Sequence, residues 1–160
     1  MYGVGKIWDI FSGRGLTEMS YSDTNDHGID LSIEYLRRPG RSLVFSNLVD
    51  FDSKYGHRND PQGYAKALEA LDRRVPELLD ALDGGLFFLS GDHGCDPTSP
   101  DSTDHTREHT PMLASGLPGG PYALGDRGCF GDLGVTIGDA LGVSTDGLAG
   151  TSVAVEVGLR

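Results

Sequence analysis

The sequence predicts an α/β protein built on parallel strands. Two short apolar runs, at residues 42–51 and 86–90, are typical of buried strands. An amphipathic segment at residues 60–82 separates them. A strand, a crossover helix and a second strand form a unit whose two strands are normally parallel neighbours. The 24 glycines indicate tight turns between such elements.

The helix predicted at residues 60–82 has clear signals at both ends. Its apolar side chains recur every three or four positions and form one stripe. Asp60 stands where an N-cap is expected, and Pro61 suits the first helical position. Residues 83–85, Asp-Gly-Gly, end the helix. The remaining predicted elements are, in chain order, a helix at residues 28–38, the strands at 42–51 and 86–90, a third strand at 111–115 and a helix at 131–142.

Composition favours a single cytoplasmic domain over residues 1–160. The chain is 38% hydrophobic and has no apolar run near the ~20 residues that a membrane span needs. The N-terminus lacks the apolar stretch of a secretory signal, and two cysteines are too few for a disulfide framework.

The charge balance restricts the partners. With 13 basic and 24 acidic residues the formal charge is −11, which repels nucleic acid and anionic membranes. We therefore expect neither as a partner. Phosphorylated substrates are repelled too, unless bound cations reverse the local sign.

Aspartate and histidine gather after the two predicted strands. The first strand leads into Asp52 and His57, the second leads into Asp92 and His93, and His105 follows in the same irregular stretch. Ligands of open parallel sheets bind beyond the carboxyl ends of the strands, so these side chains are expected to converge at one edge.

Convergent carboxylates and imidazoles favour a divalent metal. Mixed oxygen and nitrogen ligands suit manganese or zinc. Five candidate ligands exceed the needs of one catalytic metal, and two neighbouring metals suit phosphoryl transfer. The alternative is that these side chains lie in solvated turns.

Longer motifs resemble a known family. The stretches concerned are "NLVDFDSKYGHRNDPQGYAKALEALD", "GDHGCDPT", "TDHTREHTP", "GKIWDIFSGRGLTE" and "FGDLGVTI". In this order they resemble phosphopentomutases, which belong to the alkaline phosphatase superfamily. The resemblance implies a parallel-sheet α/β/α sandwich of the alkaline phosphatase-like type that is incomplete. Residues 1–160 would be the C-terminal, metal-binding portion of the core domain, with the N-terminal part and the cap missing.

The resemblance also implies an activity and a set of site residues. The family interconverts ribose or 2-deoxyribose 1-phosphate and the 5-phosphate, using two manganese ions and a phosphorylated threonine; zinc or magnesium are alternative metals here. The residues carried over by matching position are Asp52, His57 and His105 for one metal, Asp92 and His93 for the other, and Lys6 near the substrate.

The family's nucleophilic threonine has no counterpart in this chain. Thr103, Thr106 and Thr110 stand outside its motif, so no catalytic residue is assigned and the isolated chain is expected to be inactive. The expected partners are a phosphorylated pentose and either the missing N-terminal part or a second copy of the chain.

Two other functions stay open. The chain could belong to another metal-dependent phosphotransferase or hydrolase of the superfamily, such as a cofactor-independent phosphoglycerate mutase, or be a non-catalytic metal-binding remnant. Other polar side chains receive structural interpretations: Arg107 in an ion pair, His109 as a partner that orients a ligand, His27 solvated, Cys95 packed, Cys129 in the core, and Arg58 with Asp60 bracing the turn after His57.

Overall fold

A three-stranded parallel sheet lies at the centre of the fold. The structure is a computed structural model and describes residues 1–159. The sheet contains β1 (Tyr2–Val4), β2 (Glu18–Ser20) and β3 (Val44–Ser46) in the order β2-β1-β3. Neither β1 nor β2 was predicted, because a strand of three residues is too short to show an alternating pattern.

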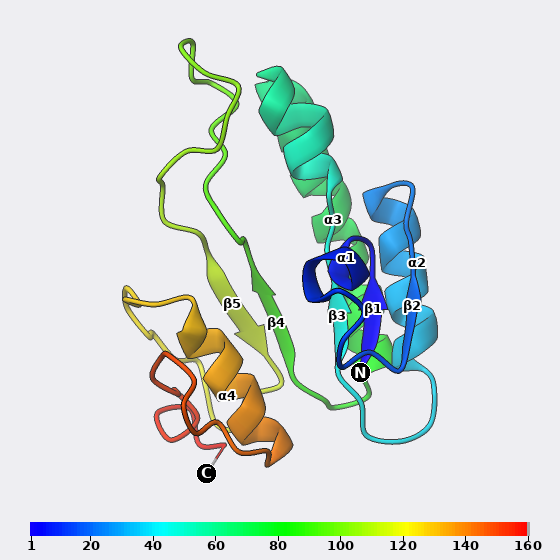
Figure 1. The fold of residues 1–160 in the computed structure, drawn as a ribbon, viewed down its shortest axis with the longest axis vertical. Helices are drawn as coiled ribbons and strands as arrows, with labels where there is room; N and C mark the ends of the chain where they lie inside the picture. The colour runs from blue at the N-terminus through cyan, green and yellow to red at the C-terminus, as the bar shows by residue number, and fades with distance from the viewer. Residues whose placement is uncertain (160) are drawn as a thin grey trace.

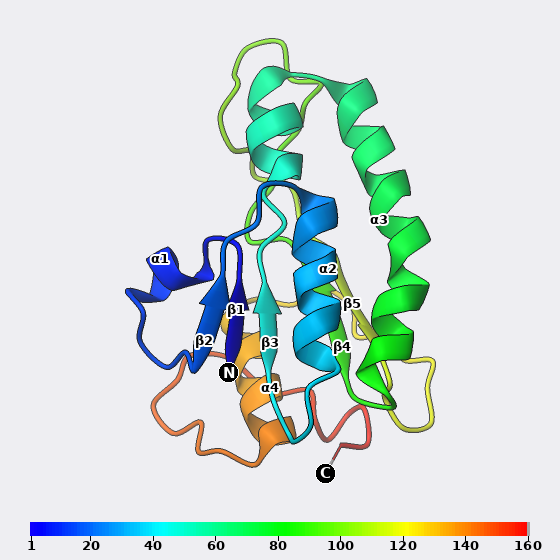
Figure 2. The same cartoon turned by 90° about the vertical axis from the view of Figure 1, so that its right-hand side faces the viewer.

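Helices cover both sides of the strands (Figures 1 and 2). The helices α2 (Asn25–Leu36) and α3 (Pro61–Leu82) lie on one side, and α4 (Gly131–Leu141) lies on the opposite side. The short helix α1 (Ile7–Phe11) follows β1. The predicted α/β class with a parallel sheet is confirmed.

A second, separate pair of strands follows α3. β4 (Phe87–Ser90) and β5 (Met112–Ser115) are antiparallel. The prediction that the strands at residues 42–51 and 86–90 are bonded neighbours is wrong, since β3 pairs with β1 and β4 pairs with β5. A crossover helix favours the direction of the next strand but does not determine which strand it pairs with. Here β1 pairs with β3, and β5, which follows the loop after β4, pairs with β4.

The strand predicted at residues 42–51 is also shorter than expected. β3 ends at Ser46, and helical turns begin at Asp50. Both β3 and β4 nevertheless run toward the same end of the molecule, where the segments that follow them meet (Figure 2). The convergence expected of the site residues therefore survives the change of strand partner.

The ends of α3 agree with the prediction. Asp60 caps the helix by accepting a hydrogen bond of 2.9 Å from the backbone N–H of Gly63, and Pro61 is the first helical residue. Asp83 ends the helix in a left-handed conformation with φ of 48°. These signals are local, so the sequence alone is enough to place them.

The main apolar cluster lies between α2, α3 and the start of β4. Thr24 caps α2 by accepting from the backbone N–H of His27 at 3.1 Å, so this helix begins before the predicted residue 28. Burial of each large aliphatic side chain contributes roughly 1.5–3 kcal/mol to folding. The cluster contains the buried Ile29, Ile33, Leu78 and Ala81, with Leu36, Leu48, Leu71 and Phe87 packed against them. Across residues 1–159 no helix combines the length and the apolar character needed to cross a bilayer.

Candidate metal centre

Asp52 lies in a wide helical turn between β3 and α3. Residues Phe51–Tyr55 form a π-helical turn, a rare conformation that is often found at functional sites. The turn is fixed to the start of α2, because the backbone N–H of Asp50 donates to Asn25 Oδ1 and the backbone N–H of Asn25 donates to Asp50 Oδ2, each at 2.9 Å. The position of Asp52 is therefore set by a rigid neighbour rather than by a free loop.

His57 follows in the next turn. Residues Gly56–Arg58 form a 3-10 turn that ends at Asn59, which is left-handed with φ of 49°. Cys95 lies so close to the α-carbon of Gly56 that a β-carbon there would collide with its sulfur. Glycine at this position lets the His57 turn approach the loop that follows β4.

The loop after β4 doubles back on itself and brings two histidines together. Gly94 and Thr106 form an antiparallel bridge, in which the backbone N–H of Thr106 donates to the carbonyl of Gly94 at 2.9 Å. The rings of His93 and His105 are stacked, with centroids 3.6 Å apart. Residues separated by twelve positions thus act as neighbours.

Three imidazoles surround one carboxylate oxygen. Asp52 Oδ1 lies 3.2 Å from His57 Nε2, 3.3 Å from His105 Nε2 and 4.0 Å from His93 Nε2. Two groups within the described residues have the spacing to hold a metal ion, with ligand atoms no more than 4.8 Å apart. These groups are Asp52 with His93 and His105, and His57 with Asp104 and His105.

Hydrogen bonds indicate where the histidine protons lie. His57 Nδ1 donates to the carbonyl of Thr103, and His93 Nδ1 donates to the carbonyl of Gly94 at 3.1 Å. A carbonyl oxygen can only accept, so each Nδ1 carries a proton, and in a neutral ring Nε2 then presents a lone pair. Metal-binding histidines are commonly held this way by a bond from their other nitrogen.

The unpaired atoms fit a cation. Asp52 Oδ1 is buried and accepts no hydrogen bond, while the Nε2 lone pairs of His57 and His93 face it. A divalent cation among these atoms would satisfy the carboxylate and several imidazoles together.

Further carboxylates near the cluster make its surroundings negatively charged. Burial raises the pKa of the Cys95 thiol, and the carboxylates of Asp52, Asp96, Asp104 and Glu108 raise it further. Burial also raises the pKa of Tyr64, with smaller contributions from Cys95 and Asp52. Cys95 is therefore a neutral thiol packed against Gly56 rather than an activated nucleophile.

Comparison with known proteins identifies the family. Residues 5–145 match the model of a family described as the metalloenzyme superfamily. The chain belongs to the metalloenzyme superfamily.

Several similar proteins carry one name. The chain is 53% identical over 156 residues to a phosphopentomutase of Anaeromyxobacter dehalogenans (strain 2CP-1), which covers 97% of the chain and 39% of that protein. It is 52% identical over 147 residues to a phosphopentomutase of Thermotoga maritima and 50% identical over 145 residues to that of Kosmotoga olearia. Each match covers 89% of the chain and 37% of the relative. The chain thus spans about two fifths of the length of these relatives.

Two of the predicted site residues, Asp92 and Lys6, belong to neither group with metal-binding spacing. Asp92 is 74% exposed, and its Oδ1 lies 3.6 Å from His93 Nε2, outside both groups with metal-binding spacing. Lys6 is exposed at the end of β1 and makes no ion pair with any of residues 1–159. Because β1 and β3 are parallel, Lys6 and the Asp52 turn leave the sheet at the same edge.

Two residues of the site were missed by sequence reasoning. Asp104 shares a group with His57 and His105, and the sequence signal was its place directly before His105. Asn59 joins the His57 turn to the loop after β4, and its side-chain amide donates to the carbonyls of Ser99 and Ser102. No sequence pattern distinguishes an asparagine with this role.

The structural interpretations of other side chains give mixed outcomes. Arg107 forms no ion pair with any of residues 1–159, and its predicted ion pair stays a prediction. His109 lies 3.8 Å from the exposed Asp126 instead of orienting a ligand, and Cys129 is exposed rather than in the core. His27 belongs to the first turn of α2, with its side chain 45% exposed. Arg58 donates to the carbonyl of His57 at 3.1 Å, in agreement with its predicted bracing role.

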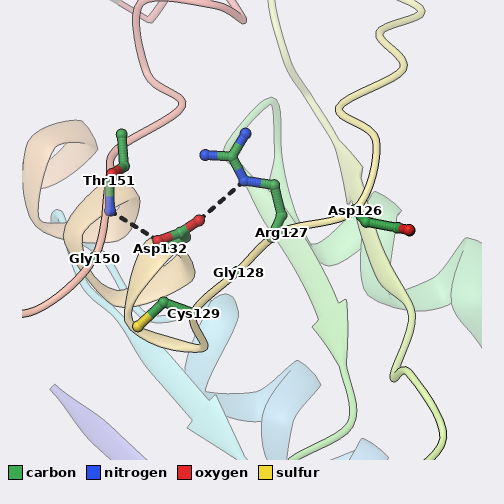
Figure 3. Close-up of a pocket in the computed structure, with 7 residues that line it drawn as sticks. All are labelled: Asp126, Arg127, Gly128, Cys129, Asp132, Gly150 and Thr151. Atoms are coloured by element: carbon green, nitrogen blue, oxygen red, sulfur yellow. Dashed lines mark hydrogen bonds and ion pairs between the residues drawn. The ribbon is translucent and has the colours of Figure 1, made fainter.

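A shallow hollow of about 500 Å³ lies elsewhere, at the start of α4 (Figure 3). Its central carboxylate, Asp132, is only 5% exposed and accepts from the backbone N–H of Thr151 at 2.8 Å and from Arg127 Nε at 3.0 Å. These bonds hold the pKa of Asp132 below its usual range, the Thr151 bond most strongly. Arg127 also lies 3.6 Å from Glu156. The buried carboxylate of Asp132 is therefore paired with the guanidinium of Arg127.

Proposed function

We propose that the chain supplies the metal-binding part of a phosphopentomutase, which interconverts (2-deoxy)ribose 1-phosphate and (2-deoxy)ribose 5-phosphate. The observation that carries the proposal is the buried carboxylate oxygen Asp52 Oδ1, which has three imidazoles around it and no hydrogen-bond partner. The shared name of relatives at 50–53% identity supports the choice of reaction.

In this proposal two metal ions bind at the end of the sheet. Asp52, His57 and His105 hold one ion, and Asp92 and His93 contribute to the other; manganese is the proposed metal, with zinc or magnesium as alternatives. Bound metals supply positive charge that orients and neutralises a phosphate group. The formal charge of −11 makes such cations necessary for binding a sugar phosphate.

The chain's own side chains divide the remaining tasks. The backbone carbonyls of Thr103 and Gly94 keep a proton on Nδ1 of His57 and His93, which leaves both Nε2 atoms free to bind. Lys6, exposed at the same edge and without an ionic partner in residues 1–159, supplies a positive charge for the substrate phosphate.

The residue that carries the phosphoryl group is not assigned within these 160 residues. A mutase of this type needs a covalent carrier, and metals alone cannot replace it. We therefore expect the chain to form the mutase site only together with a segment that brings the carrier threonine.

Metal titration tests the proposed centre. Calorimetric addition of Mn²⁺ to the chelator-treated chain should give one strong site, because three ligands are assigned to one ion and two to the other. His57→Ala should abolish that site. Two equal sites that persist in His57→Ala would contradict the assignment.

An activity assay tests the reaction. The chain alone should not convert ribose 1-phosphate, whereas the chain mixed with the N-terminal portion of the Anaeromyxobacter relative should. Turnover by the chain alone would require a substitute carrier, with Ser102, Thr103 and Thr106 as the residues to test. Strong metal binding without activity in the mixture would favour the metal-binding remnant, and turnover of a phosphoglycerate instead would favour the mutase of that substrate.

Self-association is a further part of the proposal. Within residues 1–159, β3 is bonded along one edge only, and so is β4. Unpaired strand edges promote association with another strand. We expect concentration-dependent dimers or larger species in sedimentation velocity, and a monomer at all concentrations would contradict this.

A further inference from the structure

We propose that Asn59 is a positioning residue of the metal centre, which clamps the loop that carries His105 against the turn that carries His57. The inference rests on the proposed metal site and adds a residue that shapes it without touching the ion. It follows from the contacts that link the two segments.

The first contacts are those of the Asn59 side chain. Its Nδ2 donates to the carbonyl of Ser99 at 3.0 Å and to the carbonyl of Ser102 at 3.2 Å. Both amide protons have acceptors, so the nitrogen faces the loop, since an oxygen in its place would face two carbonyls. One side chain therefore holds both ends of a short loop segment.

The backbone of Asn59 explains why asparagine suits the position. Its φ of 49° places it in the left-handed region, and its backbone N–H donates to the carbonyl of Gly56 at 3.0 Å, closing the His57 turn. Among residues with a side chain, asparagine adopts this conformation at low cost. The same residue ends the turn and reaches across to the loop.

The clamped segment leads directly to both histidines. Ser102 Oγ accepts from the backbone N–H of Asp104 at 2.9 Å, and Asp104 Oδ1 accepts from the backbone N–H of His105 at 2.7 Å. Between them, the carbonyl of Thr103 accepts from His57 Nδ1. Loss of the clamp would release the carbonyl that orients His57 and the backbone that places His105.

Such outer contacts commonly change metal affinity by about 10–100-fold. Two variants isolate the donor atoms. Asn59→Gly keeps the left-handed backbone and removes the side chain, while Asn59→Asp keeps the shape and replaces the donors by a carboxylate. An added negative charge by itself would strengthen cation binding, so weaker binding in both variants points to the lost donors.

The experiment measures Mn²⁺ affinity by calorimetry and the His57 side chain by ¹⁵N NMR, in wild type and in both variants. We expect about 10-fold or greater weakening in each variant, with loss of the His57 Nδ1–H signal that reports the bond to Thr103. Asp83→Gly is the matched control, because Asp83 is also left-handed but caps α3. It should leave both readouts unchanged.

The outcomes separate the inference from the proposed function. Affinities and His57 signals equal to wild type in both variants would overturn the role of Asn59. Absence of Mn²⁺ binding in the wild type would instead overturn the proposed metal site, and the NMR signal would still decide whether Asn59 holds His57. If Asn59→Gly fails to fold, Asn59→Asp decides both readouts.

Discussion

The end of the sheet and the start of α4 both gather charged side chains, yet they differ in how those charges are satisfied. Around Asp52, a buried carboxylate oxygen lacks a donor and imidazole lone pairs face it. Around Asp132, a buried carboxylate accepts from a backbone N–H and from Arg127. A buried polar atom left without a partner is costly, so its presence indicates a ligand more reliably than the volume of a hollow does.

Removal of His105 should give the largest effect. His105 belongs to both groups with metal-binding spacing, so His105→Ala leaves neither complete. Loss of a direct ligand should exceed the ~10–100-fold cost of losing an outer contact, so Mn²⁺ affinity should fall by more than about 100-fold. Calorimetry measures this, with His109→Ala as the control, because His109 lies by Asp126. An unchanged Mn²⁺ affinity in His105→Ala would mean that the region around Asp52 is not the metal site.

Metal binding should stabilise the fold through the region around Asp52 and not through the region around Asp132. Mn²⁺ at about 100 times its Kd adds about 2.7 kcal/mol to the free energy of unfolding. For a chain of this size that corresponds to a rise in Tm of about 5–10 °C. Thermal denaturation with Mn²⁺ and then with excess chelator measures the shift and its reversal. His105→Ala should abolish it, and Asp132→Asn should retain it.

Asp132→Asn should lower stability without changing metal affinity. The Thr151 N–H and Arg127 depress the pKa of Asp132, so the folded chain binds fewer protons there than the unfolded chain. This contribution is complete above the ordinary aspartate range near pH ~4 and is lost as the pH falls through the folded pKa. Urea denaturation between neutral and acid pH should show a shallower acid loss in the variant. An equal loss in both proteins would contradict this account.

Glu156→Gln should have the smallest effect. Glu156 is 53% exposed and lies 3.6 Å from Arg127, and exposed ion pairs contribute about 0–1 kcal/mol. We expect a change in unfolding free energy below about 0.5 kcal/mol, with Mn²⁺ affinity unchanged. A large loss, measured by urea denaturation, would mean that Glu156 and Asp132 hold Arg127 jointly.

Those features that depend on neighbouring residues could be predicted from the sequence. The cap at Asp60 and the stop at Asp83 rest on backbone preferences and were placed correctly. Five residues in the segments after two strands were expected to converge. Asp52, His57, His93 and His105 lie together, whereas Asp92 is exposed and belongs to neither group with metal-binding spacing. The pairing of β1 with β3 could not be predicted, because β1 has three residues and its Tyr2 pairs with the distant Val44. Asn59 could not be found because its role depends on two carbonyls across the site.

The sharing of His105 limits how many ions this chain can hold tightly on its own. Both groups of suitable spacing require His105, and a nitrogen lone pair of its ring can coordinate one ion at a time. The ion proposed for Asp52, His57 and His105 takes ligands from both groups. The two groups therefore describe overlapping positions for one tightly held ion rather than two independent sites. A titration of the chain with Mn²⁺ should therefore show one tightly bound ion. Paramagnetic broadening by that ion should affect the NMR signals of residues in both groups.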